Sequence, residues 1–370
     1  MVSARASGFC GSGFGIGLNL GVVGSATDVR LRHMPSVKRR PKIQKPPILF
    51  QESQKLVARI EAELEAPLLS YWSSASGSVC QDDVVIMYEL CRGLGSAQKP
   101  LALFIKSSGG SGRESLRIIH LLRQYTSRLS ALVPLECASA ATMMALGADE
   151  IRMGPLAFLT AVDTSIRHEL SPCDIDNELV SVSQDELARV ISLWKEHGLS
   201  KDGNPVGSLM PFVHPLVVGA VDRASSLSIR LCREILSYHT RDASTAERIS
   251  NALNSAYPSH DYPITLREAE RIGLNVSPLE PVINDLLLEL HAVYSEMGQK
   301  AVTDFDEHNY HNNEIASVIE RRGCMYFYQM DKDWHYRKEE RRWTALHDNS
   351  AWTKVERVGT KIQKSVFHLR

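Results

Sequence analysis

The stretch that most constrains the fold lies between residues 101 and 154, where buried strands alternate with helices. LALFIK is a near-continuous apolar run of strand length, as in a parallel strand that is covered on both faces. Glycines and an apolar-periodic helix follow it, SALVPLECA predicts a second buried strand, and SAATMMALG predicts a short helix of small residues. DEIRMG follows as a third strand. This order of elements predicts parallel crossover units and therefore an α/β fold.

Both turns in this stretch place backbone N–H groups at the start of a helix. The first turn is built on Gly109 and Gly110, and the second on Ser139. Such N–H groups can receive an oxyanion, and glycine lets the backbone approach a substrate closely. The N–H of Ala140, with that of Gly109 or Gly110, would then form an oxyanion hole. A serine at this place is equally well explained as a helix N-cap, and no GxGxxG or GxxxxGK[ST] motif indicates nucleotide binding.

The flanking segments predict one large domain with smaller segments at both ends. Beyond residue 300 the composition turns polar, then aromatic and basic, and runs such as CMYFYQM and WHYRK alternate like strands. We therefore divide the chain into a flexible tail with a basic linker (1–50), a main domain (51–300) and a small β-rich C-terminal module (301–370). Apolar periodicity predicts further helices at residues 51–65, 81–95, 183–198, 215–239, 246–254, 266–273 and 281–298.

Composition and charge exclude several classes of protein. With 44% apolar residues the chain can bury a sizeable core, and a formal charge of −1 argues against a general nucleic-acid binder. Seven glycines interrupt the uncharged run Ala6–Thr27, which favours an extended tail over a signal peptide or a membrane span. The seven cysteines are scattered without a CxxC pair, as in a reduced cytosolic protein. We expect a cytoplasmic protein with no membrane or nucleic-acid partner.

Three segments together resemble the serine dehydrogenase proteinase family of the Clp protease and crotonase superfamily. They are IKSSGG before a helix, CASAATMMALGADEIRMGP, and YPSHDYPITLREAERIGL, within roughly residues 65 to 300. The resemblance implies a ClpP/crotonase-like spiral of ββα units, homo-oligomeric assembly, and cleavage of a peptide or protein substrate. We expect no cofactor and no metal. The resemblance places Ser139 as the nucleophile and Gly109 and Gly110 in the oxyanion loop. Asp261 matches the aspartate that precedes an EA…GL helix in Clp proteases, and His260 lies beside it.

The chain departs from Clp proteases in the position of its histidines. Where Clp proteases carry the catalytic histidine, this sequence reads PLAFLTAVDTSIRHEL, with Asp163 near the expected place and His168 a little beyond. A serine nucleophile needs a base, and the base needs an orienting partner. His260 with Asp163 would serve if the turn around residue 260 folds back over Ser139. His168, a lysine dyad and an impaired site remain alternatives; the nearest lysine, Lys106, is expected to extend to the surface.

Two other groups of residues carry weaker functional signals. The polar run after residue 300 has metal-ligand types, including an HxxH pair that would share a helical face, but a polar linker explains it better, so no metal site is predicted. Its members are Asp304, Asp306, His308, His311 and Glu314. Cys137 precedes the serine by two positions and is best read as a small buried residue.

The sequence thus favours a serine-nucleophile hydrolase, most consistent with a peptidase of the Clp type. Two alternatives stay open. One is a catalytically impaired scaffold or binding protein on the same fold. The other is an acyl-CoA enzyme that would use the same two turns to bind a thioester oxyanion.

Overall fold

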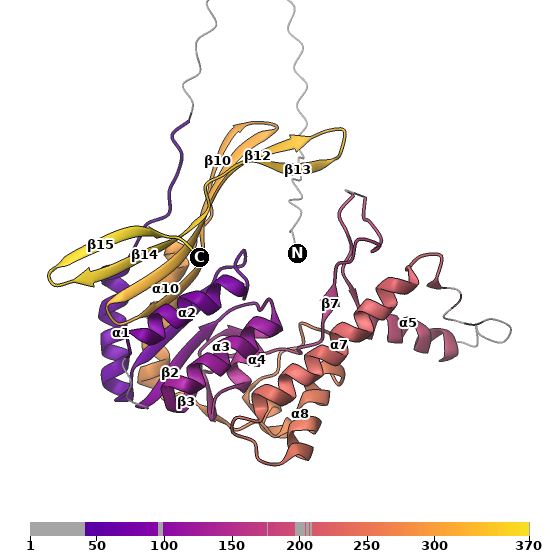
Figure 1. Ribbon diagram of the computed structural model, residues 1–370, viewed down its shortest axis with the longest axis horizontal. Helices are drawn as coiled ribbons and strands as arrows, with labels where there is room; N and C mark the ends of the chain where they lie inside the picture. Colours follow the sequence, from indigo (N-terminus) through magenta and orange to yellow (C-terminus); the bar gives the residue numbers. More distant parts are fainter. Residues whose placement is uncertain are drawn as a thin grey trace, which may run out of the picture. The chain divides into compact units, whose positions relative to one another are not determined.

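The computed structural model describes residues 41–94, 99–175, 177–196, 204, 207 and 209–369. Of the tail and basic linker predicted for residues 1–50, the first forty residues lie outside this range. The described residues from 41 onward belong to one unit, a mixed α/β structure, so the predicted α/β class is confirmed (Figure 1). None of its helices is both long and apolar enough to cross a lipid bilayer.

Parallel strands form the centre of the main sheet, as the alternation of strands and helices predicted. The predicted strand SALVPLECA is divided in the structure at Pro134, which supplies no N–H for a ladder. Its second part pairs with β6 (Phe158–Leu159) in a separate small sheet as β4 (Glu136–Cys137). In spatial order the parallel strands of the main sheet are β1 (Leu68–Ser73), β2 (Lys99–Lys106), β3 (Thr126–Val133), β5 (Glu150–Met153) and β9 (Val276–Pro278).

Helices cover both faces of this sheet because its strands are apolar on both sides. In β1, Leu69 and Tyr71 belong to one core cluster, whereas Leu68 and Trp72 belong to the other. The first cluster includes residues of α2 (Gln81–Arg92), α3 (Gly112–Tyr125) and α4 (Ala140–Leu146). The second includes residues of α1 (Phe50–Leu64) and α10 (Pro281–Met297). Burying one large apolar side chain stabilises the fold by about 1.5–3 kcal/mol. Because successive side chains of a strand point to opposite faces, apolar residues at neighbouring positions require a helical layer on each face.

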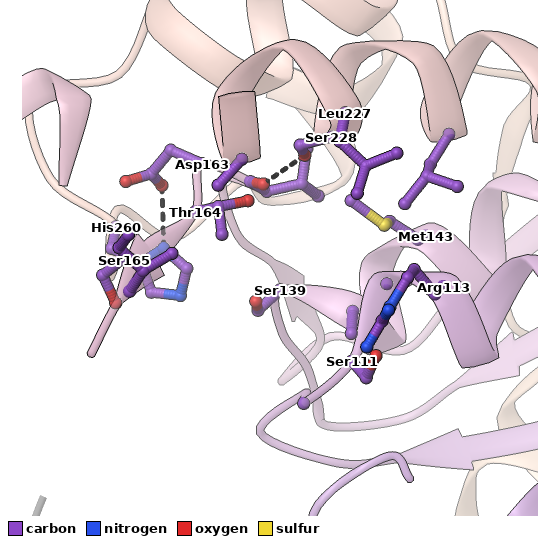
Figure 2. A pocket seen from close by; sticks show the side chains of 17 residues that line it. Ser111, Arg113, Ser139, Met143, Asp163, Thr164, Ser165, Leu227, Ser228 and His260 are labelled. Carbon is purple, nitrogen blue, oxygen red and sulfur yellow. Dashed lines mark hydrogen bonds and ion pairs between the residues drawn. The ribbon is translucent and has the colours of Figure 1, made fainter. Parts of the chain in front are cut away.

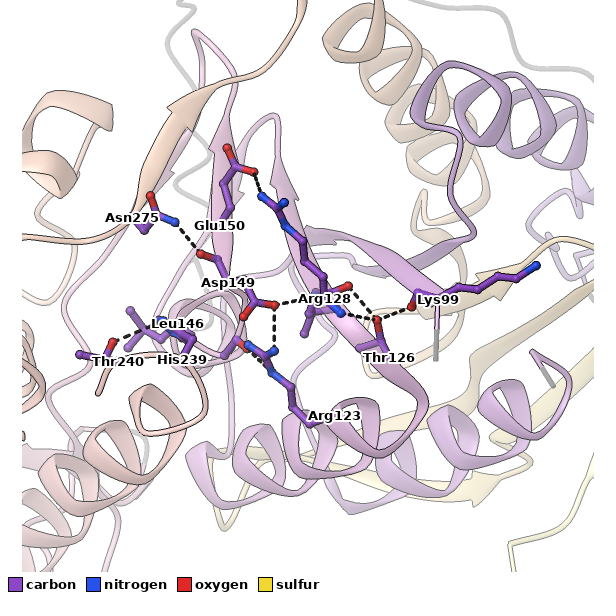
Figure 3. A network of polar contacts seen from close by, with 12 residues as sticks. Lys99, Arg123, Thr126, Arg128, Leu146, Asp149, Glu150, His239, Thr240 and Asn275 are labelled. Atoms are coloured by element: carbon purple, nitrogen blue, oxygen red, sulfur yellow. Dashed lines mark hydrogen bonds and ion pairs between the residues drawn. The ribbon is translucent and has the colours of Figure 1, made fainter. Parts of the chain in front are cut away.

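The C-terminal end of α4 is held by a polar network (Figure 3). Arg123 donates to the carbonyl of Gly147 at 2.7 and 3.1 Å and to Asp149 at 2.8 Å. His239 Nε2 donates to the carbonyl of Leu146 at 2.8 Å. The guanidinium satisfies a free carbonyl just past the helix and places a cation at the negative end of the helix dipole. These bonds fix the direction of α4, whose other end begins next to Ser139.

Among the helices between α4 and α10, α7 (Pro215–Leu236) contacts α3 and α4, and α5 (Gln184–Glu196) and α8 (Ala243–Ser255) pack on α7 (Figure 1). The predicted helices in this region are confirmed, with ends that differ by a few residues. They are α5 (Gln184–Glu196), α7 (Pro215–Leu236), α8 (Ala243–Ser255) and α9 (Leu266–Ile272). A two-stranded ribbon of β7 (Ser165–Ile166) and β8 (Val182–Ser183) precedes them.

The region after residue 300 is β-rich, as predicted, and it continues the main sheet. β11 pairs antiparallel with β1, so the sheet runs across the boundary that we drew at residue 300. His311 lies in β11 and His308 in the turn before it, so the expectation that the HxxH pair shares a helical face is wrong. The strands are β10 (Ala301–Asp306), β11 (Asn309–Arg321), β12 (Cys324–Arg337), β13 (Arg342–Asp348), β14 (Ala351–Val358) and β15 (Lys361–Phe367).

Candidate active site

The two turns singled out in the sequence lie side by side. The N–H of Ser107 donates to the carbonyl of Glu136 at 3.1 Å, and the N–H of Ala138 donates to the carbonyl of Ser107 at 2.9 Å. These bonds form an isolated parallel bridge between Ser107, just past the end of β2, and Cys137 at the end of β4. Because parallel strands end at the same edge of a sheet, the glycine turn and the serine turn emerge next to one another.

Ser139 occupies a strained turn between strand and helix. Its backbone has φ 52° and ψ −119°, in a region that residues other than glycine rarely adopt. Such a conformation costs about 1–3 kcal/mol and persists only where the surroundings impose it. Here the N–H of Ser139 donates to Oγ1 of Thr160 at 2.8 Å, and its carbonyl accepts from the N–H of Met143 at 3.2 Å. Strained turns between a strand and a helix present the nucleophilic serine in α/β-hydrolases.

The glycine turn needs glycine at both positions. Gly109 has φ 105°, and a Cβ there would lie 2.7 Å from Cβ of Ser139. Gly110 has φ 144°, and a Cβ there would lie 2.4 Å from the backbone nitrogen of Val79. A side chain at Gly109 would therefore clash with Ser139, and one at Gly110 would clash with the backbone of Val79, so either would displace the turn.

The hydrogen bonds distinguish between the two candidate oxyanion donors. The N–H of Gly109 donates to Oγ of Ser107 at 3.2 Å. Within the described residues, the N–H groups of Gly110 and Ala140 have no acceptor, and both residues line the pocket in front of Ser139. Gly110 and Ala140 are thus the pair with N–H groups available for an oxyanion.

His260 and Asp163 meet although they are 97 positions apart in the chain. Backbone hydrogen bonds of 2.8 and 2.9 Å join Leu159 to Ile264 and bring the turn around residue 260 beside the loop after β6. Nδ1 of His260 then donates to Oδ1 of Asp163 at 2.7 Å. This hydrogen bond raises the pKa of His260 above 6.5, against the opposing effect of partial burial. The carboxylate also fixes the tautomer that leaves Nε2 free to accept a proton.

The loop that carries Asp163 is anchored by two helices. The N–H of Val162 donates to the carbonyl of Leu253 in α8 at 2.9 Å. The hydroxyl of Ser228 in α7 donates to the carbonyl of Val162 at 2.8 Å. These bonds hold the carboxylate in a defined position, which a base-orienting group requires.

Ser139, His260 and Asp163 line a common pocket of about 380 Å³. Figure 2 shows the imidazole of His260 between Asp163 and Ser139, with its second nitrogen on the side of the serine. Among the described residues, no hydrogen bond links Oγ of Ser139 to this ring. Catalytic hydrogen bonds commonly shorten only when a substrate is bound. Met143, together with Leu227 and Leu231 of α7, forms an apolar wall of the pocket; Figure 2 shows Met143 on the side of Ser139 away from His260.

The other candidate bases lie elsewhere. His168 does not line the pocket, and its Nδ1 accepts from the N–H of Leu170 at 3.1 Å. Lys106 does not extend to the surface as expected. Its side chain is only 14% exposed, and its ammonium donates to the carbonyl of Ser73 at 3.0 Å and lies 3.5 Å from Glu136. The carbonyl of Ser73 accepts a hydrogen bond from the ammonium, and the carboxylate of Glu136 balances its charge. These contacts replace the hydration that the lysine side chain would find at the surface.

Two further predicted residues have clear environments. Asp261 is exposed, and its N–H donates to Oγ of Ser259 at 3.3 Å; it is Asp163, and not Asp261, whose carboxylate accepts from His260. Cys137 is fully buried, as predicted, and burial raises the pKa of its thiol, so the thiol stays protonated.

Sequence reasoning missed three parts of this site. Thr160 supports the backbone of Ser139, Ser107 occupies the N–H of Gly109, and α7 forms a pocket wall. The apolar face of α7 was visible as periodicity, but nothing in the sequence linked that face to Ser139. Arg113, which also lines the pocket, was one of several charges on a predicted helix.

Comparisons with known proteins give distant similarities. No protein-family model matches the chain. The uncharacterized protein MJ0137 of Methanocaldococcus jannaschii is 24% identical over 205 residues, or 55% of this chain and 63% of that relative. The chain therefore matches less than two thirds of this relative's length.

Two kinds of solved structure are similar to the chain at low TM-scores. A serine-to-alanine mutant of the membrane-bound stomatin-specific protease 1510-N is similar over 64% of this chain and 88% of its own, with 15% identity and a TM-score of 0.36. ClpP1 from Listeria monocytogenes is similar over 64% of this chain and 99% of its own, with 12% identity and a TM-score of 0.34. A mutant of the same ClpP1 covers 65% of this chain, with 14% identity and a TM-score of 0.33.

Proposed function

We propose that this chain is a serine peptidase in which Ser139 is the nucleophile, His260 the general base and Asp163 its orienting partner. The observation that carries the proposal is the hydrogen bond of 2.7 Å between His260 and Asp163, two residues that line the same pocket as Ser139. A base with an orienting carboxylate beside a strained serine turn is the arrangement that serine hydrolases require.

The proposed reaction uses the groups of the pocket in a definite order. Nε2 of His260 takes the hydroxyl proton as Oγ of Ser139 attacks the substrate carbonyl. The N–H groups of Gly110 and Ala140 donate to the oxyanion, and His260 then delivers the proton to the leaving amine. Water, deprotonated by His260 in turn, hydrolyses the acyl-enzyme and regenerates Ser139.

Asp163 keeps His260 ready for this role. Ionised Asp163 stabilises the imidazolium that forms during attack, which is why it raises the pKa of His260. A raised pKa makes the imidazole a stronger base. It also requires a higher pH before the neutral, active form predominates.

The resemblance to the serine dehydrogenase proteinase family supports the choice of peptide bonds as the target. The same resemblance leads us to propose a homo-oligomer. The scattered cysteines lead us to propose a cytoplasmic location. The proposed reaction uses no cofactor. Asp261 adds a nearby negative charge to His260 and is assigned no contact with the reacting atoms.

Labelling with a fluorophosphonate probe tests the proposal directly. The full chain should be labelled on Ser139, and the Ser139→Ala variant should not be. Ser165→Ala, which removes another serine of the same pocket, should keep the label. If the wild type resists labelling, the impaired scaffold becomes the better description, and equal labelling of Ser139→Ala would show that the nucleophile is a different residue.

A further inference from the structure

Arg113 lies in the candidate active site but has no role in the proposed mechanism. It is the second residue of α3 and lines the same pocket as Ser139. Figure 2 shows it on the side of Ser139 opposite to His260 and Asp163. A substrate with its carbonyl at Ser139 would therefore have one flank facing His260 and the other facing Arg113.

The charge of Arg113 is not neutralised by the described residues. The nearest carboxylate in sequence belongs to Glu114, which accepts from the hydroxyl of Ser111 and lies 3.7 Å from the guanidinium of Arg117. The carboxylate of Asp163 is bonded to His260 on the far side of the pocket. In the described ranges Arg113 forms no ion pair, so its side of the pocket carries a positive charge.

Apolar groups lie directly beside this charge. Gly112 packs so closely on α4 and α7 that a Cβ there would lie 2.6 Å from Sδ of Met143 and 3.5 Å from Leu231. Leu227 lines the same wall. The side of the pocket next to Arg113 thus combines an apolar surface with a planar cation. This combination fits a substrate group with a short aliphatic part that ends in a carboxylate.

We propose that Arg113 is a specificity-determining residue that binds a carboxylate of the substrate next to the bond attacked by Ser139. The proposal rests on the proposed function for the position of that bond. A guanidinium presents a fork of N–H donors that matches a carboxylate in two parallel hydrogen bonds. The carboxylate can belong to a glutamate or aspartate side chain or to the C-terminus of a peptide.

Peptide binding to the full chain with Ser139→Ala measures this preference without turnover. The probes are pools of fluorescein-labelled hexapeptides, each randomised except for one position held as Glu or as Gln. Each pool is made with a free C-terminus and with a C-terminal amide. We expect one position at which Glu binds about fivefold tighter than Gln, as for a partly exposed charge pair. A preference for free acid over amide, with no Glu effect, would identify the C-terminal carboxylate as the ligand.

Two further substitutions in the same background assign the preference to Arg113. Arg113→Gln should abolish it, and Arg113→Glu should reverse it, so that the Gln pool binds tighter than the Glu pool. Arg117→Gln, which removes a cation one turn along the same helix and outside the pocket, should leave it unchanged. Equal binding of the Glu and Gln pools, together with equal binding of free acids and amides, would overturn the proposal, as would a preference that survives Arg113→Gln.

The same experiments separate this inference from the proposed function. If the wild type is labelled by the fluorophosphonate but the peptides show no carboxylate preference, the peptidase proposal stands and the role of Arg113 is refuted. If the wild type is not labelled but the preference appears and depends on Arg113, the carboxylate site stands and the peptidase proposal fails.

Discussion

Replacing Asp163 by asparagine isolates the contact on which the proposed mechanism depends. The amide has nearly the same shape as the carboxylate, so the hydrogen bond to His260 can be kept while the negative charge is lost. The amide can also donate its N–H to Nδ1 of His260, which would place the ring proton on Nε2 and block proton uptake from Ser139.

The structure indicates the size of the effect. In a buried triad the equivalent substitution lowers the rate by about 10⁴-fold. Here the His260 side chain is 42% exposed and that of Asp163 19% exposed, so solvent screens part of the interaction. We therefore expect a loss of about 10²- to 10³-fold in the rate at which Ser139 reacts, or about 3–4 kcal/mol.

The pH dependence should change in a definite direction. Only neutral His260 can act as the base, so the rate should rise with pH and level off above the pKa of that histidine. Because Asp163 raises this pKa above 6.5, the wild-type midpoint should lie above 6.5. In Asp163→Asn the cause of the increase is gone, so the midpoint should move to lower pH while the plateau falls.

The assay is the second-order rate of fluorophosphonate labelling of Ser139 between pH 5 and 9. Asp261→Asn is the matched control, since it removes a neighbouring carboxylate that accepts no hydrogen bond from His260; it should lower the midpoint slightly and keep most of the rate. An unchanged rate and midpoint in Asp163→Asn would refute the assignment of the base. A larger loss in Asp261→Asn would show that the carboxylates exchange roles in solution.

Two further predictions concern the oxyanion turn and the core. Gly110→Ala places a Cβ 2.4 Å from the backbone nitrogen of Val79 at φ 144°, so the N–H of residue 110 should move and the labelling rate of Ser139 should fall by about 10²-fold. The control Gly359→Ala, at φ 61° in open space, should cost about 1 kcal/mol of stability and leave labelling intact. Equal labelling of both variants would contradict the assignment of Gly110 as an oxyanion donor. Burial raises the pKa of Glu320 from 4.5 to about 7, so stability of about 3 kcal/mol that is present below pH 4.5 is lost as the pH rises through 7. Burial also raises the pKa of Asp83 to about 7, so Glu320→Gln should remove about half of the loss of stability that urea unfolding measures between pH 4.5 and 8. An unchanged pH dependence in Glu320→Gln would assign the whole loss to other groups.

Local pattern was sufficient to predict most of the elements around the site. The apolar run of β2, the glycines after it and the small residues after Ser139 each describe a backbone conformation that depends on near neighbours in the chain. For the same reason the sequence identified the turns that hold Gly110 and Ala140. It left open whether Gly109 or Gly110 has a free N–H. In the structure the N–H of Gly109 donates to the hydroxyl oxygen of Ser107, so the N–H of Gly110 is the one available.

The contacts between segments that lie far apart in the sequence were visible only in the tertiary structure. The pairing of Leu159 with Ile264 brings His260 to Asp163, and the packing of α3 on α4 brings Arg113 to the pocket of Ser139. The pairing of β11 with β1 attaches the C-terminal strands to the main sheet. Periodicity and turn chemistry report which face of a segment is buried, but they carry no information on what covers it. The sequence alone therefore identified the turn of the proposed nucleophile, and the fold brought the proposed base, its carboxylate partner and the charge of Arg113 to the same pocket.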